Sequence, residues 1–245
     1  MLNVRFKLNK RRYSLIMNIG IILSIIFLPI FAYPGPGNLK EAIDLLSSAN
    51  WMERSAGAMR LSELADIDLN QKVEILVNSL RNEIDAPLSM DMAEGSYMTI
   101  NEYLKNQYCL TIKGLGTSAK ETIIKSLNST SGELKSRLMI ILGLLGEKVY
   151  KNDIRKIYYS SEDGYLRLFA LRALISFGDL EDVPLFKDAL NDEFQAYNNS
   201  DVVGRNKNIY IIRMDAAGIL GMLGYKLKAM GDGYIILSEP EQEKK

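Results

Sequence analysis

The sequence predicts an all-α fold, an α-solenoid of about five stacked helix pairs. Beyond residue 38, apolar residues recur at spacings of three and four, which is the period of an amphipathic helix, and alternating strand patterns are scarce. Five segments can be laid over one another, and a second amphipathic segment follows each of them except the last. Because one helix pair cannot bury its own apolar faces, we expect the pairs to stack around a shared core.

The five predicted first helices share a basic residue at their start and a small residue eleven positions later. They cover residues 54–65, 105–116, 135–146, 167–178 and 213–224. The basic residues are Arg54, Lys105, Lys135, Arg167 and Arg213. Apolar residues mostly follow at offsets of four, seven and ten, which lie on one helix face and predict the buried side. The last four segments close on glycine, namely Gly116, Gly146, Gly178 and Gly224. Glycine predicts a helix end there, because it tolerates the left-handed backbone of a C-cap.

The predicted second helices cover residues 71–83, 119–130, 149–161 and 180–192. Two insertions lengthen the repeat and follow the first and the last of these helices. Insertion 1 is residues 84–100, and insertion 2 is residues 193–208. Because both leave from equivalent points of the repeat, we expect them on the same edge of the stack.

Residues 38–231 resemble HEAT repeats, especially the short HEAT-like units of the bilin-lyase type. The shared pattern is a basic residue, small residues three or four positions later, and a closing Leu-Gly-x-Leu-Gly. The last segment fits it best, with Arg213, Ala216, Ala217, Leu220, Gly221, Leu223 and Gly224. The resemblance implies a right-handed, curved stack whose concave surface holds another macromolecule, and it implies no particular activity.

The N-terminal residues 1–32 have the plan of a secretory signal peptide, with basic residues first, then an apolar stretch that ends at Ala32. The alternative is an uncleaved anchor over residues 15–33, whose length approaches the ~20 residues that span a bilayer. Residues 33–37 are rich in proline and glycine and predict a linker. Either outcome places the repeat domain outside the cytoplasm, in the periplasm, in the cell envelope or secreted. Residues 232–245 are expected to be a charged C-terminal tail.

The composition of the 245-residue chain excludes several kinds of chemistry. It has no histidine, so it cannot build a Ser-His-Asp or Cys-His nucleophile or a histidine metal ligand. Its single cysteine, Cys109, rules out an intrachain disulfide and a multi-cysteine metal site. We therefore expect no catalytic residue, no cofactor and no metal. Without the first 32 residues, the chain carries 25 basic and 30 acidic residues, which disfavours a nucleic-acid partner.

The two insertions contain the candidate partner-binding residues. These are Met90, Met92, Tyr97 and Met98 in insertion 1, and Phe194, Tyr197 and Asn199 in insertion 2. Methionine and aromatic side chains on loops suit adaptable protein recognition. The alternatives are that both insertions are tolerated surface loops, or that insertion 1 contains a short extra helix. The repeated basic residues are expected to pair with acidic or carbonyl groups of neighbouring repeats, the alternative being a basic stripe for an anionic partner.

These patterns predict an exported, non-catalytic scaffold that binds another protein. Nucleic acid is not an expected partner, and membrane contact is expected only through an uncleaved N-terminal segment. One alternative is an enzyme or small-ligand-binding protein resembling the bilin lyases. The other is a lineage-specific protein of the envelope or surface.

Overall fold

Helices make up most of the part of the chain that the computed structural model describes, which covers residues 37–89, 91, 93, 98–196 and 209–240. This part contains ten α-helices and one two-stranded sheet. The all-α prediction is therefore confirmed in its main part, and the sheet is an addition to it. None of these helices is both long and apolar enough to cross a membrane. The predicted signal peptide or anchor lies outside the described residues.

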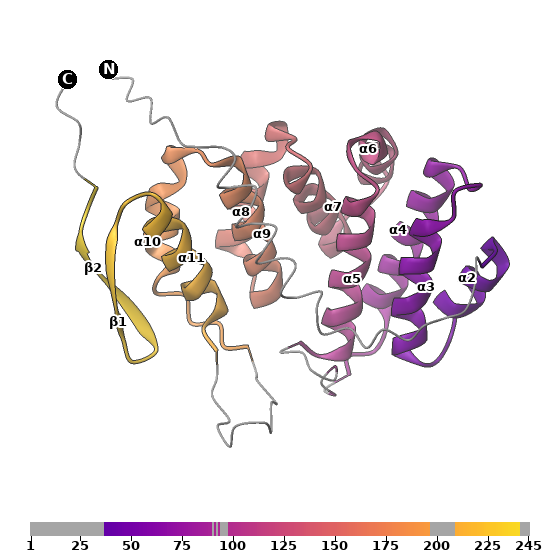
Figure 1. Ribbon diagram of the computed structural model, residues 1–245, viewed down its shortest axis with the longest axis horizontal. Helices are drawn as coiled ribbons and strands as arrows, with labels where there is room; N and C mark the ends of the chain where they lie inside the picture. The colour runs from indigo at the N-terminus through magenta and orange to yellow at the C-terminus, as the bar shows by residue number, and fades with distance from the viewer. Residues whose placement is uncertain (1–36, 90, 92, 94–97, 197–208, 241–245) are drawn as a thin grey trace. The chain divides into compact units, whose positions relative to one another are not determined.

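The helices follow one another in the order shown in Figure 1. The α-helices are α2 (Leu39–Leu46), α3 (Trp51–Glu63), α4 (Leu69–Asp85), α5 (Ile100–Gly114), α6 (Lys120–Asn128), α7 (Gly132–Leu144), α8 (Lys151–Ser160), α9 (Gly164–Phe177), α10 (Val183–Ala189) and α11 (Ile211–Met222). Single 3-10 turns precede α6, α8 and α10, and these are η1 (Thr117–Ala119), η2 (Lys148–Tyr150) and η3 (Leu180–Asp182).

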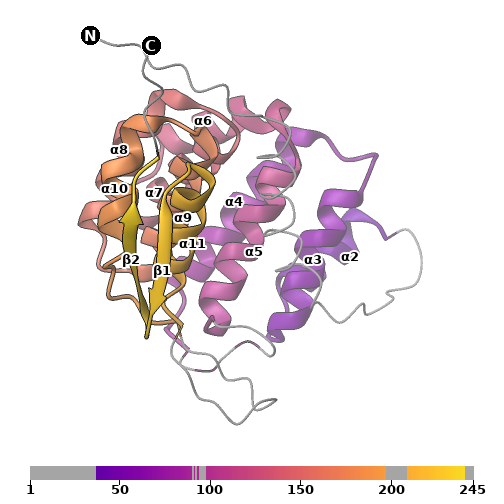
Figure 2. The same ribbon diagram turned by 60° about the vertical axis from the view of Figure 1, so that its left-hand side comes forward.

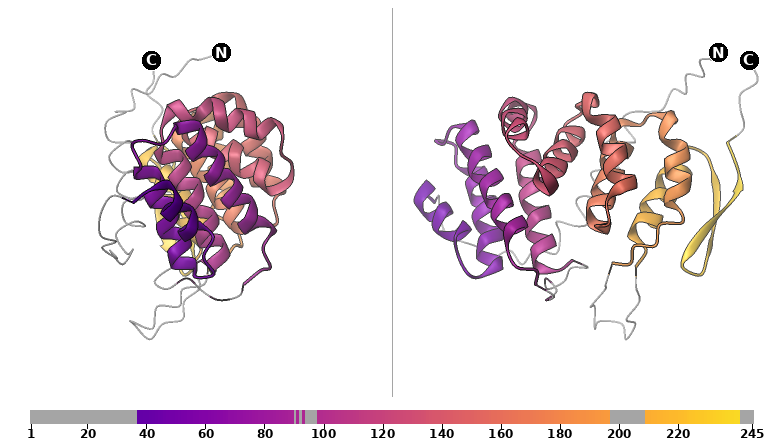
Figure 3. Two further views of the ribbon diagram at one scale, coloured as in Figure 1. Left: turned by 90° about the vertical axis from the view of Figure 1, so that its right-hand side faces the viewer. Right: turned by 180° about the vertical axis from the view of Figure 1, so that it is seen from behind.

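The five predicted first helices are α3, α5, α7, α9 and α11, and the four predicted second helices are α4, α6, α8 and α10. Each first helix packs on the next one, so that α3 contacts α5, α5 contacts α7, α7 contacts α9 and α9 contacts α11. Figures 1 and 3 show these helices lying side by side in chain order. Helix α2 precedes the first predicted pair and packs against α3.

The predicted ends of the last four first helices are confirmed. The predicted buried face is confirmed at the offset of seven, whereas all residues at the offset of ten and three of those at the offset of four are only half-buried. The four closing glycines have positive φ, at 84° for Gly116, 89° for Gly146, 64° for Gly178 and 92° for Gly224. This is the left-handed region in which a side chain is strained, and which glycine enters freely. The residues seven positions after each basic residue are all fully buried: Leu61, Ile112, Leu142, Leu174 and Leu220. The spacing in the sequence therefore identifies the face of each helix that meets the core.

The C-terminal region contains a β-hairpin that the sequence pattern did not reveal. Strand β1 (Lys226–Met230) pairs antiparallel with β2 (Gly233–Ser238), and both contact α11 (Figure 2). The expected boundary between repeat domain and tail, at residues 231 and 232, falls in the turn between the strands, where Gly231 has φ of 58°. Residues up to 238 are thus folded rather than part of a charged tail. The alternation in β1 is only five residues long and follows a helix stop, which is a weak strand signal.

Candidate functional site

Arg54 and Arg167 hold the same structural position in their repeats. The guanidinium of Arg54 donates to the carbonyl oxygens six and five residues earlier, at 2.9 and 3.0 Å, and lies 2.7 Å from the carboxylate of Glu83. Arg167 donates to the carbonyls at the same two offsets, at 3.0 and 3.2 Å, and pairs with Asp192 at 3.0 Å. Each arginine thus links the first turn of a first helix to a carboxylate at the end of the following second helix (Glu83) or just beyond that end (Asp192).

Of the other three predicted basic residues, Lys105 and Arg213 have partners within the fold, and Lys135 is exposed. Lys105 pairs with two glutamates, and Arg213 donates to the carbonyl oxygens of Asp192 and Asp232 at 2.6 and 3.2 Å. The expected pairing with an acidic or carbonyl group of a neighbouring repeat is found at Lys105 and Arg213, whereas the carboxylate partners of Arg54 and Arg167 lie in the predicted second helices of their own repeats. The same expectation is wrong for Lys135, whose side chain is exposed. The buried cation of α7 is instead Arg137, two residues further along the helix and 1% exposed.

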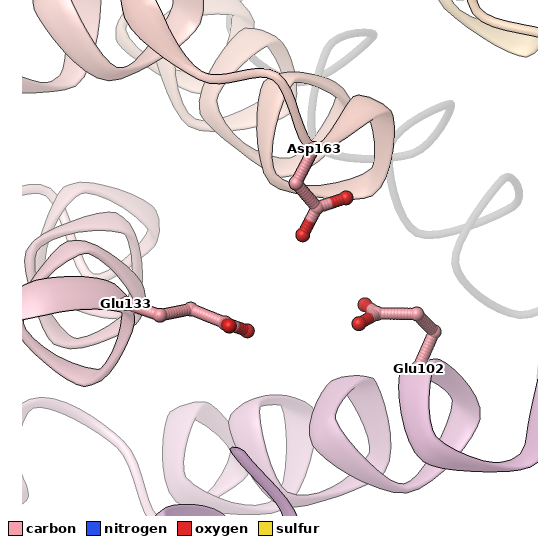
Figure 4. Close-up of side chains that lie close together, drawn as sticks. All are labelled: Glu102, Glu133 and Asp163. Carbon is pink, nitrogen blue, oxygen red and sulfur yellow. The ribbon is translucent and has the colours of Figure 1, made fainter. Parts of the chain in front are cut away.

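Arg137 lies in a partly buried cluster of charged side chains at the junction of α5, α7 and α9, in which Glu133 and Asp163 are half-exposed. Figure 4 shows its three carboxylates pointing toward one another: Glu102 from α5, Glu133 from α7 and Asp163, the N-cap of α9. Arg137 lies 2.8 Å from Glu102, 2.7 Å from Glu133 and 3.7 Å from Asp163. Lys105 lies 2.7 Å from Glu102 and 3.1 Å from Glu133.

Three converging carboxylates are a possible ligand set for a metal ion, since their oxygens lie within 4.8 Å of one another. Lys105 and Arg137, however, already place their cationic groups against these same oxygens. A metal ion would have to displace both cations, which are themselves almost fully buried. The chemistry of the cluster is therefore that of an ion-pair network that joins three helices, because buried charges need such partners.

The cluster shifts the acidities of its members. Burial raises the pKa of Asp163, and the negative charge of Glu102 adds to this effect, while Arg137 opposes it. Burial is the largest single effect on Glu133 and works against its ionisation, but the charges and hydrogen bonds of Arg137 and Lys105 together outweigh it and lower the pKa of that carboxyl. Burial raises the pKa of the Cys109 thiol, beside Arg137, to about 11. The thiol is therefore neutral at pH 7 and a poor nucleophile.

We expect Asp163→Asn to stabilise the protein at pH 7, with a gain that disappears near pH 4. A carboxyl whose folded-state pKa lies above its ordinary value of 3.8 destabilises the fold when it ionises. Below that value it is protonated in both states and has no effect, so the penalty develops as the pH rises from 3.8 to the folded-state pKa and is constant above it. Asparagine keeps the N-cap bond that Asp163 accepts from the backbone N–H of Tyr165 at 2.8 Å. Urea unfolding at the two pH values measures the difference.

The exposed Asp153 on α8 provides the control for this measurement. Asp153→Asn removes an aspartate that pairs with the exposed Lys156 at 3.3 Å, and we expect little change at either pH. If Asp163→Asn were less stable than the wild type at pH 7, the charge of Asp163 would contribute to stability, contrary to this account.

A pocket of about 760 Å³ lies at the N-terminal end of the described helices. Its walls come from α2, α3, α4, α5 and the start of insertion 1. The apolar part of the lining includes Ile43, Trp51, Ile75 and Ile100, and the polar part includes Ser47, Asn78, Asn82, Ser89 and Asn101. The volume falls in the range of ~300–1,000 Å³ that is typical of ligand sites in proteins.

Three polar side chains also line this pocket, namely those of Arg54, Glu83 and Tyr108. Arg54 and Glu83 form the ion pair described above, and burial raises the pKa of Glu83 although Arg54 opposes the shift. Tyr108 is fully buried, and its hydroxyl lies beside the guanidinium of Arg54. Burial is also the main reason that the pKa of Tyr108 is raised, so the hydroxyl stays protonated and able to donate.

The residues predicted to bind a partner are not brought together in the described part of the chain. Met98 is 3% exposed and belongs to the core, so it is not available as a loop contact. Phe194 is half-buried and packs edge-on against Tyr165 at 4.8 Å, directly over Gly164. Both side chains are used for packing within this chain. The remaining predicted residues lie outside the described residues, and these are Met90, Met92, Tyr97, Tyr197 and Asn199.

The pocket itself was missed at the sequence level, because its walls come from four helices and a loop. One signal was available in the second repeat, where Tyr108 stands in a position that the repeat pattern gives to a small residue. A large polar side chain at a packing position is a departure from the repeat pattern, and it marks a repeat that lines the pocket.

Comparison of the chain with protein-family models gives no match, and a comparison with curated proteins gives none either.

Proposed function

We propose that this protein is an exported, non-catalytic scaffold, built as a HEAT-like α-solenoid, that binds a segment of another protein. The observation that carries the proposal is the pocket between α2, α3, α4 and α5, with an apolar lining and a rim of asparagines. Ligand sites of this kind combine apolar walls with a few polar groups that fix orientation. Their rigid support here is the row of first helices that pack on one another.

The solenoid interpretation is supported by the repeated structural details of the first helices. Four of them close on a glycine with positive φ, and Arg54 and Arg167 make the same carbonyl and carboxylate contacts. The non-catalytic assignment is supported by the ion pairs of Arg54, Lys105 and Arg167 with carboxylates of the fold, because these pairs give the basic residues a structural role. The export assignment rests on the basic and apolar pattern of residues 1–32.

A capture experiment with a matched pair of variants tests the binding function. Asn78 and Asn82 are exposed on α4 and line the pocket, so the double variant Asn78→Ala, Asn82→Ala alters the site with little risk to the fold. The control is Asn152→Ala on α8. Asn152 accepts a hydrogen bond from Arg155 three residues later, as Asn78 does from Arg81.

We expect the wild type and Asn152→Ala to capture the same protein from an envelope extract of the source cells, and the double variant to lose it. All three should share one melting temperature. Equal capture by the three proteins would place the binding site elsewhere. The mass of the mature protein tests export separately, since cleavage after Ala32 removes the whole N-terminal segment.

A further inference from the structure

We propose that the chain forms a twofold dimer in which strand β2 pairs antiparallel with β2 of a second copy, so that the two hairpins join into one four-stranded sheet. The surface concerned lies at the opposite end of the row of helices from the pocket, and the inference does not depend on the proposed function.

The hairpin is the last layer of the described fold. Figures 1 and 3 show it at the end of the row of helices, where both of its strands contact α11. Each earlier first helix packs on the next first helix, whereas α11 is followed by the hairpin. The terminal layer of a repeat stack needs a polar outer face to stay soluble as a monomer. The composition of the hairpin's outer face therefore indicates whether something packs on it.

The outer face of the hairpin is apolar. Side chains alternate between the two faces of a strand, and in β2 the half-buried Tyr234 and Ile236 alternate with Ile235 and Leu237, which are 45% and 60% exposed. Met230 of β1 is also exposed. Together these are three of the ten large hydrophobic side chains exposed in the described chain, although the hairpin is a small part of it. Such a concentration of exposed apolar side chains is typical of an interaction site.

The two edges of the hairpin differ in charge. Strand β1 carries Lys226 and Lys228, and lysine is a residue with which proteins protect an edge strand from pairing. Strand β2 (Gly233–Ser238) contains no charged residue. In the described sheet its outer edge has no strand beside it, so its outward N–H and C=O groups are open to another strand.

The charges at the two ends of the hairpin fit a second copy. Asp232 lies in the turn and Lys226 at the open end, and neither side chain is ion-paired within the described residues. An antiparallel copy places the turn of one hairpin beside the open end of the other, so each Asp232 lies near a Lys226, twice by symmetry. Glu239, which follows β2 at the open end, is already paired with Lys187 and so repels Asp232 less.

Pairing also covers the apolar surface. A twofold axis through the sheet keeps Ile235 and Leu237 of both copies on one face, where neighbouring strands bring their side chains together. A sheet of three or more strands is more stable than a lone hairpin. The chain that follows β2 offers no apolar cover of its own, because residues 241–245 contain only glutamate, glutamine and lysine.

Sedimentation equilibrium of the purified chain tests the dimer, and we expect twice the mass of a single chain. The double variant Ile235→Lys, Leu237→Lys sets like charges of the two copies against one another, so it should sediment as a monomer. The control is Leu88→Lys, Val149→Lys, which replaces two exposed apolar residues outside the hairpin and should remain a dimer. Because all four positions are exposed, the three proteins should have the same helix content by circular dichroism.

Hydrogen exchange locates the contact. The backbone amides of residues 233–238 should exchange more slowly in the wild type than in the hairpin lysine variant, whereas those of residues 226–230, on the opposite edge, should exchange equally in both. Charge exchange tests the alignment. Lys226→Asp should raise the dissociation constant of the dimer about twofold to tenfold, since an exposed ion pair is lost twice, and adding Asp232→Lys should restore it.

The inference is overturned if the wild type sediments as a monomer, if the hairpin lysine variant remains a dimer, or if residues 233–238 exchange equally in both proteins. If the wild type is a monomer and captures from the envelope extract a protein that the hairpin lysine variant does not, the hairpin binds that protein instead of a second copy. Failure of Asp232→Lys to restore the dimer of Lys226→Asp would overturn the antiparallel alignment.

Discussion

Arg137→Met is expected to lower the free energy of unfolding by about 3–5 kcal/mol, the usual effect of removing one partner from a buried ion pair. The guanidinium is 1% exposed and lies within 4 Å of Glu102, Glu133 and Asp163, so its loss leaves Lys105 as the remaining cation of the cluster. Methionine fills most of the space, which limits the contribution of a cavity. Urea unfolding followed by circular dichroism at pH 7 measures the change.

Two comparisons show whether the charge is responsible for this loss. Lys156→Met removes an exposed cation that pairs with Asp153 at 3.3 Å, and it should cost less than about 1 kcal/mol. Adding Glu133→Gln to Arg137→Met removes one uncompensated anion while Lys105 keeps its pair with Glu102 at 2.7 Å, and it should restore part of the lost stability. A loss below about 1 kcal/mol for Arg137→Met alone would mean that water screens the remaining carboxylates and that the ion pairs of Arg137 contribute little to stability.

Gly57→Ala is expected to destabilise the protein by about 1–3 kcal/mol, although alanine is normally the better helix former. Helices α2 and α3 approach so closely at this residue that an added Cβ would lie 2.7 Å from the backbone nitrogen of Leu46 and 3.0 Å from the carbonyl oxygen of Ala42. Neither atom can move without shifting α2. Because Ile43 and Leu46 of α2 line the pocket, we expect the tryptophan fluorescence to change as well.

Gly218→Ala is the matched control, since Gly218 lies in α11 with open space around the position of the added Cβ. The same substitution should there stabilise the protein by about 0.5–1 kcal/mol. Urea unfolding of the two variants measures both effects. If both substitutions had the same sign, the close approach of α2 to α3 would not control the stability at Gly57.

Local features of the chain were predictable from the sequence. The helix ends at Gly116, Gly146, Gly178 and Gly224 follow from backbone preferences of single residues, and the buried faces follow from periodicity. The pairing of Arg54 and Arg167 with acidic groups was also predictable, although their partners lie in their own repeats rather than in neighbouring ones. These inferences require information from only one or two neighbouring elements.

Features that depend on distant residues were not predictable in this way. Arg137 and Glu102 are 35 residues apart, and nothing in the local pattern distinguishes Arg137 from Lys135 as the buried cation. Met98 resembled a flexible loop contact, yet the chain returns there to begin α5 and buries it. The pocket depends on where α2 lies against α3, and the close approach at Gly57, rather than a motif, accompanies that placement.

Insertion 2 is closed at its base by a pair of backbone hydrogen bonds, in which Ala196 and Ile209 each donate an N–H to the other's carbonyl oxygen, at 2.9 and 3.0 Å. Arg213 contacts both sides of this base. It donates a hydrogen bond to the carbonyl oxygen of Asp192, and its guanidinium carbon lies 3.9 Å from the centroid of the Tyr210 ring. The ends of the insertion are therefore fixed by the scaffold. Doubling the length of a flexible segment between fixed ends costs only about 0.6 kcal/mol of closure entropy. For protein engineering, Ala196 and Ile209 thus provide a fixed pair of anchor points, between which an epitope or a reporter domain can be spliced while the flanking helices keep their register.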